Sequence, residues 1–102
     1  MIRIQSMDAY WKDIQRMADK LSDKDNAIIC MEECGELCQV ISKAERNRAT
    51  DDYSQARMNL IEEMADVMIC IDIQRSIHTI SDKELEDMIR KKLFRNMQRI
   101  NG

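Results

Sequence analysis

The most constraining feature of this sequence is the near absence of residues that break a helix. The chain has no proline and only two glycines, Gly35 and Gly102. Strand-rich folds need tight turns, which draw on glycine and proline, so we expect this chain to be helical. Its 102 residues predict one domain, residues 1–102. A chain this small can bury more apolar surface if it associates with a second subunit.

Three pairs of residues are spaced like N-capping pairs, in which a side chain accepts a hydrogen bond near the first turn of a helix. They are Ser22 with Asp25, Asp52 with Gln55, and Ser81 with Glu84. The resulting fold prediction is all-α, a four-helix bundle-like subunit with a solvent-exposed connection inside residues 42–57. The expected helices cover residues 7–21, 23–46, 53–79 and 82–100.

Charge and hydropathy exclude several classes of function. With 16 basic and 19 acidic residues the net charge is −3, so no overall positive field attracts nucleic acid. No apolar run approaches the ~18 residues of a membrane span, and the first residues have no signal-peptide core. We therefore expect a cytoplasmic protein without nucleic-acid or membrane partners, whose four cysteines are reduced, buried thiols.

Acidic residues fall on the apolar side of the second predicted helix. At 100° per residue, Glu33 lies inside an arc of apolar side chains and Glu36 at its edge, while Glu32 turns toward the polar side. Burying an unpaired carboxylate costs several kcal/mol. A cation is therefore expected beside these residues.

The third predicted helix repeats this pattern. It is apolar nearly all round, which predicts that the subunits oligomerise through the long central helices. Glu63 and Asp66 nevertheless project from it, three residues apart as Glu33 and Glu36 are. Four converging carboxylates repel one another unless a cation neutralises them, and an oxygen-only ligand set suits Mg²⁺ or Mn²⁺. The alternatives are pairing with Lys or Arg, or exposure of the acids to water.

The fourth predicted helix carries complementary chemistry. Lys92 and Asn96 lie inside its apolar stripe and Arg99 flanks it. A cation and an amide turned inward can bind phosphate oxygens. Alternatively, the Lys92 stem lies along the apolar surface while its ammonium group stays in water. Lys43, Arg46 and Arg48, near the exposed connection, are either solvated or close over a ligand.

The motifs together resemble a known family. The segment EECGE over residues 32–36, followed after 26 residues by EMAD over 63–66, is similar to the paired E-E-x-x-E and E-x-x-D motifs of MazG-like pyrophosphohydrolases. Lys92, Asn96 and Arg99 look like the K-x-x-x-N-x-x-R element of many members. The likeness covers the second to fourth predicted helices. One departure is Cys70, which stands where many relatives have tyrosine.

This resemblance implies a fold, a reaction and a set of site residues. It implies an all-α homodimer or homotetramer that hydrolyses (deoxy)nucleoside triphosphates to monophosphate and pyrophosphate, cleansing the nucleotide pool. Glu33, Glu36, Glu63 and Asp66 would hold Mg²⁺ with Glu32 as a possible helper, and one of these carboxylates would act as the base. Lys92, Asn96 and Arg99 would contact the triphosphate. Trp11 is a candidate for stacking on the base, although its spacing with Ile14 and Ala18 also suits core packing.

Other functions remain open at this point. Phosphoribosyl-ATP hydrolysis belongs to the same superfamily. A non-catalytic helical module, either a nucleotide sensor or an interaction domain, would need no turnover. A di-iron bundle is nearly excluded, because it wants two E-x-x-H pairs and the only histidine, His78, has Arg75 three residues before it.

Overall fold

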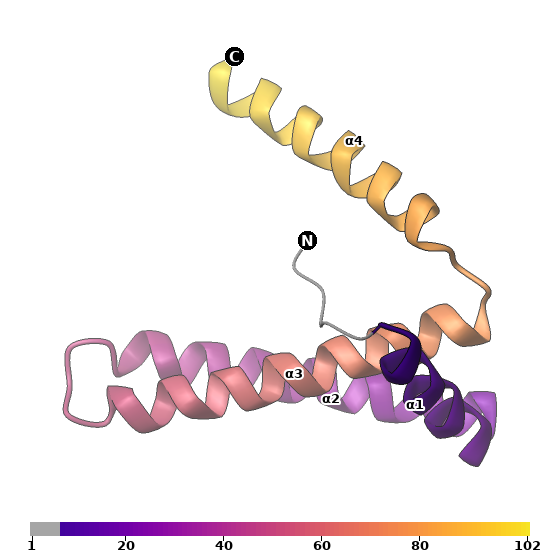
Figure 1. Cartoon of the computed structure of the whole chain (residues 1–102). Coiled ribbons are helices and arrows are strands. Elements are labelled where there is room, and N and C mark those ends of the chain that lie inside the picture. Colours follow the sequence, from indigo (N-terminus) through magenta and orange to yellow (C-terminus); the bar gives the residue numbers. More distant parts are fainter. Residues whose placement is uncertain (1–6) are drawn as a thin grey trace.

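The computed structural model describes residues 7–102, with side chains from Tyr10 onward, and this part of the chain consists of four helices (Figure 1). The all-α prediction is confirmed, and each predicted helix end lies within two residues of the observed one. No helix among residues 7–102 has the length and apolar character that crossing a membrane requires. The helices are α1 (Met7–Lys20), α2 (Asp23–Arg46), α3 (Tyr53–Ile77) and α4 (Asp82–Asn101).

Two of the three predicted caps are present. The Ser22 hydroxyl accepts a hydrogen bond of 3.0 Å from the Asp25 backbone N–H, and Ser81 forms a reciprocal capping box with Glu84. The prediction for Asp52 is wrong, since its side chain makes no cap bond. The turn before α3 relies instead on Thr50, whose hydroxyl donates to the Asn47 carbonyl at 2.9 Å and accepts from the Asp52 N–H at 3.2 Å.

Helices α2 and α3 lie antiparallel and make the most extensive helix–helix contact in the described part of the chain (Figure 1). Residues alternately three and four positions apart are buried or half-buried on each helix, which is the heptad spacing of coiled-coil packing. We call these two rows the seam. On α2 the seam contains Asn26, Cys30, Glu33, Leu37, Val40 and Ala44, and on α3 it contains Ala56, Leu60, Glu63, Val67, Cys70 and Gln74.

Helix α1 packs on the C-terminal half of α3. Ile14, Ala18 and Ile73 are buried together there. A polar network borders this core: the Tyr10 hydroxyl donates to Asp72, and Arg75 pairs with Asp72 at 3.2 Å and also with Asp82. Because Asp72 and Arg75 are nearly fully buried, at 4% and 5% exposure, the network fixes the end of α3 relative to α1 and to the start of α4.

The position of α4 differs from the expected four-helix bundle. This helix buries none of its residues and stands clear of the other three (Figure 1). Its direction is set at the junction, where Thr79 has a φ of +54° and the Ile80 N–H bonds to the Arg75 carbonyl at 2.9 Å. This is a Schellman-type helix end, and the capping box of α4 follows it directly. The short, bonded junction turns α4 away from the body.

A contiguous apolar face remains uncovered on the α2–α3 pair. On each helix, a second row of residues with heptad spacing lies one position after the seam residues in the sequence. Because each residue turns the helix by about 100°, this row lies about 100° from the seam, in the same rotational sense on both helices. Because the helices are antiparallel, that shared sense points both rows to one face of the pair. This face, which we call the apolar face, consists of exposed Met31, Cys34, Cys38, Ile41, Ile61, Met64, Met68 and Ile71.

The cysteines divide between the seam and the apolar face. None is paired in a disulfide. Burial raises the pKa of the Cys70 thiol to about 11, so this seam residue stays protonated. The expectation that all four thiols are buried is wrong for Cys34 and Cys38, because they lie on the apolar face that no other part of the described chain covers.

We predict that Thr79→Gly stabilises the protein. A β-branched residue in the left-handed region costs of order 1 kcal/mol, which glycine avoids, so the free energy of unfolding should rise by about 1 kcal/mol. Chemical denaturation measures this. In the matched control, Thr50→Gly should lower stability through loss of its hydroxyl bonds. A Thr79→Gly variant no more stable than wild type would contradict the described junction.

Candidate metal centre

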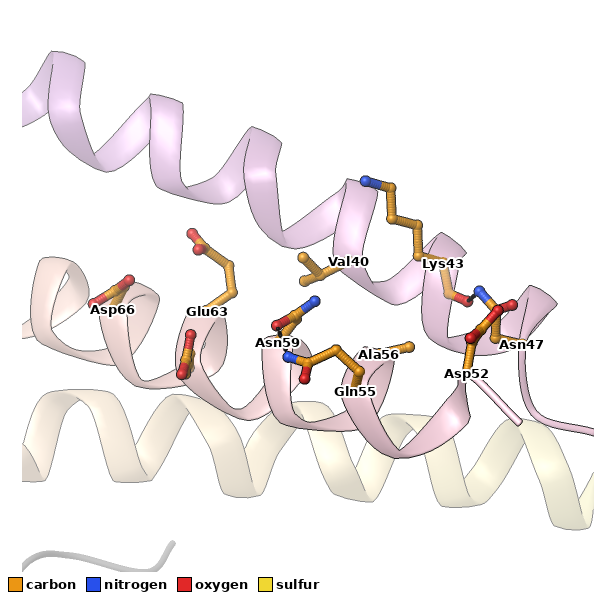
Figure 2. A pocket seen from close by; sticks show the side chains of 10 residues that line it. Val40, Lys43, Asn47, Asp52, Gln55, Ala56, Asn59, Glu63 and Asp66 are labelled. Atoms are coloured by element: carbon orange, nitrogen blue, oxygen red, sulfur yellow. Dashed lines mark hydrogen bonds between the residues drawn. The ribbon is translucent and has the colours of Figure 1, made fainter. Parts of the chain in front are cut away.

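A groove of about 430 Å³ runs along one side of the α2–α3 pair (Figure 2). Glu36 and Asp66 turn away from the seam in the sense opposite to the apolar face, so the groove and that face lie on opposite sides of the pair. The groove is lined by Val40, Lys43, Asn47, Asp52, Gln55, Ala56, Asn59, Glu62, Glu63 and Asp66.

The two ends of the groove differ in chemistry. Glu63 and Asp66 lie at one end, and amide side chains, Lys43 and the carboxylate of Asp52 line the part nearer the α2–α3 turn (Figure 2). Gln55 donates a hydrogen bond of 2.9 Å to Asn59, which fixes both amides. The groove can therefore receive an elongated ligand that is cationic or metal-bound at one end and polar at the other.

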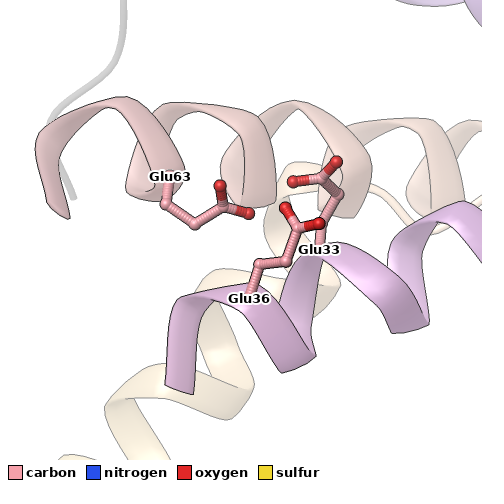
Figure 3. Close-up of side chains that lie close together, drawn as sticks. All are labelled: Glu33, Glu36 and Glu63. Carbon is pink, nitrogen blue, oxygen red and sulfur yellow. The ribbon is translucent and has the colours of Figure 1, made fainter. Parts of the chain in front are cut away.

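Three carboxylates converge beside the acidic end of the groove. Glu33 and Glu36 reach across from α2 and Glu63 from α3 (Figure 3), and one oxygen of each lies within 4.8 Å of the others. We call these three residues the carboxylate cluster. Glu33 and Glu63 are seam residues, so the packing of the two helices holds their side chains together.

The cluster holds like charges close together, in part away from water. The Glu33 Oε2 and Glu63 Oε1 atoms are buried without a hydrogen-bond partner in the described part of the chain. The hydrogen bond that a protonated Glu63 can donate to Glu33, burial, and the charges of Glu33, Glu36 and Asp66 raise the pKa of Glu63 to about 7. At neutral pH the Glu63 carboxyl group is therefore partly protonated, and a cation would take the place of that proton. Clustered carboxylate oxygens are the ligand type that Mg²⁺ and Mn²⁺ prefer, so the residues fit such an ion.

The remaining predicted acids lie around this cluster. Asp66 is exposed, lines the groove and contributes to the Glu63 shift, but it is not one of the three converging groups. Glu32 is exposed on the polar side of α2, as expected. No ion pair among residues 10–102 joins Glu33, Glu36, Glu63 or Asp66 to a Lys or Arg, so the predicted alternative of structural salt bridges does not describe them. The alternative of exposure to water does describe Glu36 and Asp66, which are both exposed.

The predicted phosphate ligands are not brought to the cluster within one chain. Lys92, Asn96 and Arg99 are exposed on α4, which stands clear of the α2–α3 pair. Lys43 is the cation that lines the groove instead. Its position seven residues after Glu36, two turns along the same side of the helix, was the available sequence signal.

Trp11 lies in a different part of the molecule. It is half-buried beneath Arg75, whose guanidinium carbon is 5.0 Å from the centre of the Trp11 ring. Arg75 is twelve residues beyond Glu63 on α3, or about 18 Å along the helix axis. This packing agrees with the core alternative for Trp11 and does not bring its ring to the acidic groove.

Comparisons with known proteins identify no relative. No protein-family model, no curated protein and no solved structure matches this chain. The likeness to MazG-like enzymes therefore stays a prediction that rests on the motifs themselves.

We predict that Glu63 makes the metal-free protein less stable as the pH rises. The folded pKa of about 7 lies above the ordinary value of 4.5, so the folded state holds more protons between these values and the free energy of unfolding falls across this window. Thermal melting in EDTA should show wild type losing stability relative to Glu63→Gln between pH 5 and 7.5.

The matched control is Glu62→Gln, an exposed neighbour, which should follow the wild-type curve. Adding Mg²⁺ at pH 7.5 should raise the melting temperature of wild type more than that of Glu63→Gln. Parallel curves for wild type and Glu63→Gln would show that Glu63 is not held among like charges.

Proposed function

We propose that this chain is the subunit of a cytoplasmic, Mg²⁺-dependent pyrophosphohydrolase that converts (deoxy)nucleoside triphosphates to monophosphate and pyrophosphate. The observation that carries the proposal is the convergence of Glu33, Glu36 and Glu63, two of them with buried, unpartnered oxygens, beside a groove. A helix pair gains no stability from carboxylates at its packing positions, which argues for a functional reason. The sequence motifs supply the reaction type.

In this proposal the cluster residues hold the ion. Bound Mg²⁺ would neutralise phosphate charge and lower the pKa of a water molecule. Asp66 and Glu32 are two of the exposed carboxylates next to the cluster, and in this proposal one of them accepts the proton of the water that attacks the α-phosphorus. Lys43 binds phosphate oxygens as a point charge, and the Gln55–Asn59 amide pair orients the polar atoms of the ligand.

The proposal includes a homo-oligomer, a dimer or tetramer, formed through the central helices. Two rows with heptad spacing and no charged residue make up the apolar face. Six of its side chains are large hydrophobic groups, from Ile61 at 43% exposure to Met31 at 67%. Two such faces can pack on each other as a four-helix bundle, which leaves both grooves on the outside.

We predict that Glu36→Gln and Asp66→Asn abolish hydrolysis while the helical circular dichroism stays unchanged. Loss of even an outer-shell partner of a metal costs about 10- to 100-fold, so we expect a fall of at least roughly 100-fold. The assay is product analysis with a panel of canonical and modified nucleoside triphosphates, in Mg²⁺ or in EDTA. Glu45→Gln, an exposed acid paired with Arg48, is the matched control and should retain full activity.

Pyrophosphate and monophosphate formed only with Mg²⁺, and lost in both variants, would support the proposal. Full activity of Glu36→Gln would contradict the metal assignment, and full activity of Asp66→Asn would exclude Asp66 as the base and leave Glu32. If no triphosphate is hydrolysed, phosphoribosyl-ATP is the next compound to test as a substrate. Binding of Mg²⁺–nucleotide without product would instead identify a sensor.

We predict that Met64→Glu combined with Met68→Glu reduces the oligomer to monomers. Both side chains are about half exposed in the single chain, so charge there is tolerated by the subunit but not by an apolar interface. Light scattering after gel filtration measures the mass. Met17→Glu on α1, equally exposed but outside the apolar face, should leave the mass unchanged, and a double variant with wild-type mass would exclude this interface.

A further inference from the structure

The groove beside the carboxylate cluster carries an excess of negative charge. Its lining contains one amine, that of Lys43, and four carboxyl groups, those of Asp52, Glu62, Glu63 and Asp66. In the part of the chain that the structure describes, none of these four acids forms an ion pair with a lysine or arginine. Acidic groups that line a cleft together concentrate cations there. The groove as a whole therefore suits a ligand that carries positive charge.

One of these acids is buried with an oxygen atom left unpartnered. Glu63 is only 9% exposed and lines the groove, and its side chain extends from α3 toward α2 (Figure 2). Its Oε1 atom has no hydrogen-bond partner among the described residues. A buried, unpartnered carboxylate is costly unless a cation or a donor reaches it. An ammonium group supplies both, since it is positively charged and has three N–H donors.

The opposite end of the groove offers acceptors that suit an ammonium group better than a second metal ion. The carboxylate of Asp52 lies there and makes no capping bond to α3. Gln55 donates its amide hydrogen to Asn59 at 2.9 Å, which leaves the Gln55 Oε1 atom as an acceptor. Mg²⁺ gives up its bound water reluctantly, so a single exposed carboxylate holds it weakly, whereas an ammonium group needs only a few acceptors.

An apolar strip separates the two acidic ends. It consists of Val40 on α2 and Ala56 on α3, which line the groove between Glu63 and Asp52 (Figure 2). Asp52 precedes Glu63 by eleven residues, which corresponds to about 16 Å along the helix axis. Methylene groups laid on this strip would be removed from water. The ligand that matches both features is a linear chain of methylene groups with an ammonium group at each end.

We propose that the groove binds a linear polyamine of about the length of spermine. One terminal ammonium group bonds to Glu63 and the other to Asp52, and the methylene chain lies on the apolar strip. Lys43 opposes binding with one charge, which the four acids outnumber. The consequence for catalysis rests on the proposed function: because the polyamine and Mg²⁺ share Glu63, the polyamine competes with the metal and inhibits hydrolysis.

The first test measures binding and does not depend on activity. ¹⁵N-labelled protein in EDTA is titrated with spermine, and the side-chain amide signals of Gln55 and Asn59 are followed by NMR. Dodecanediamine, as long as spermine but with two charges, is compared with putrescine, a short diamine of the same charge. We expect saturable shifts of both amide signals, and weaker binding of putrescine than of dodecanediamine by about tenfold or more, because putrescine cannot reach both acidic ends.

Shifts spread evenly over the acidic surface of the protein would overturn the proposal. Equal affinities for dodecanediamine and putrescine would overturn it as well, because length would then have no part in recognition.

Neighbouring aspartates provide a matched pair of variants. Asp52 lines the groove, while Asp51 is equally exposed but does not line it. Asp52→Asn should weaken spermine binding about two- to fivefold, as expected for one solvent-exposed charge pair, and Asp51→Asn should bind like wild type. Glu63→Gln should lose about tenfold or more, since a buried charged acceptor is removed. Equal losses in Asp51→Asn and Asp52→Asn would show attraction by overall charge alone and would exclude a site in the groove.

The second test separates polyamine binding from the proposed reaction. Spermine should raise the Mg²⁺ concentration that wild type needs for half-maximal hydrolysis, and Asp52→Asn should need more spermine for the same rise. Each protein is measured against its own activity without spermine. Spermine also binds the triphosphate, but that effect is the same for both proteins. Equal inhibition of the two would overturn competition in the groove. If wild type hydrolyses nothing, the proposed function fails, while the NMR titration still decides polyamine binding.

Discussion

The packing of α2 against α3 places carboxylates where a helix pair ordinarily buries apolar side chains. Glu33 and Glu63 occupy seam positions of an otherwise regular heptad pattern, and Glu63 is only 9% exposed. Like charges this close together disfavour ionisation, which is why the pKa of Glu63 is raised to about 7. The groove, the raised pKa of Glu63 and the role proposed for Asp66 all depend on this one contact between the helices.

The helices could be predicted from the sequence because their signals are local. Ser22 and Ser81 cap helices through side chains three residues from their partners, and the lack of proline leaves long stretches uninterrupted. The direction of α4 could not be predicted. It depends on Thr79 in a left-handed conformation and on the pairing of Arg75 with Asp82, a combination of backbone geometry and tertiary contact that no spacing encodes.

The candidate site likewise has one part that could be predicted from the sequence and one part that could not. Glu33, Glu36 and Glu63 were predictable, because helical spacing fixes the face of each acid and two packed faces bring them together. Lys43, Gln55 and Asn59 were not predicted as a group, since the groove they line forms only when the α2–α3 turn closes. Lys92 and Asn96 share a helix face with apolar residues, but helical spacing does not reveal that α4 stands clear of the carboxylate cluster.

Cation binding at the carboxylate cluster can be followed by titrating ¹⁵N-labelled protein with Mn²⁺ and recording paramagnetic line broadening. If the cluster holds a divalent cation, amide signals near Glu33, Glu36 and Glu63 broaden first at substoichiometric Mn²⁺, excess Mg²⁺ reverses the effect, and Glu63→Gln weakens it. Broadening that begins at exposed acids elsewhere, such as Asp51 or Glu86, or that is uniform along the chain, would rule out the cluster as the cation site.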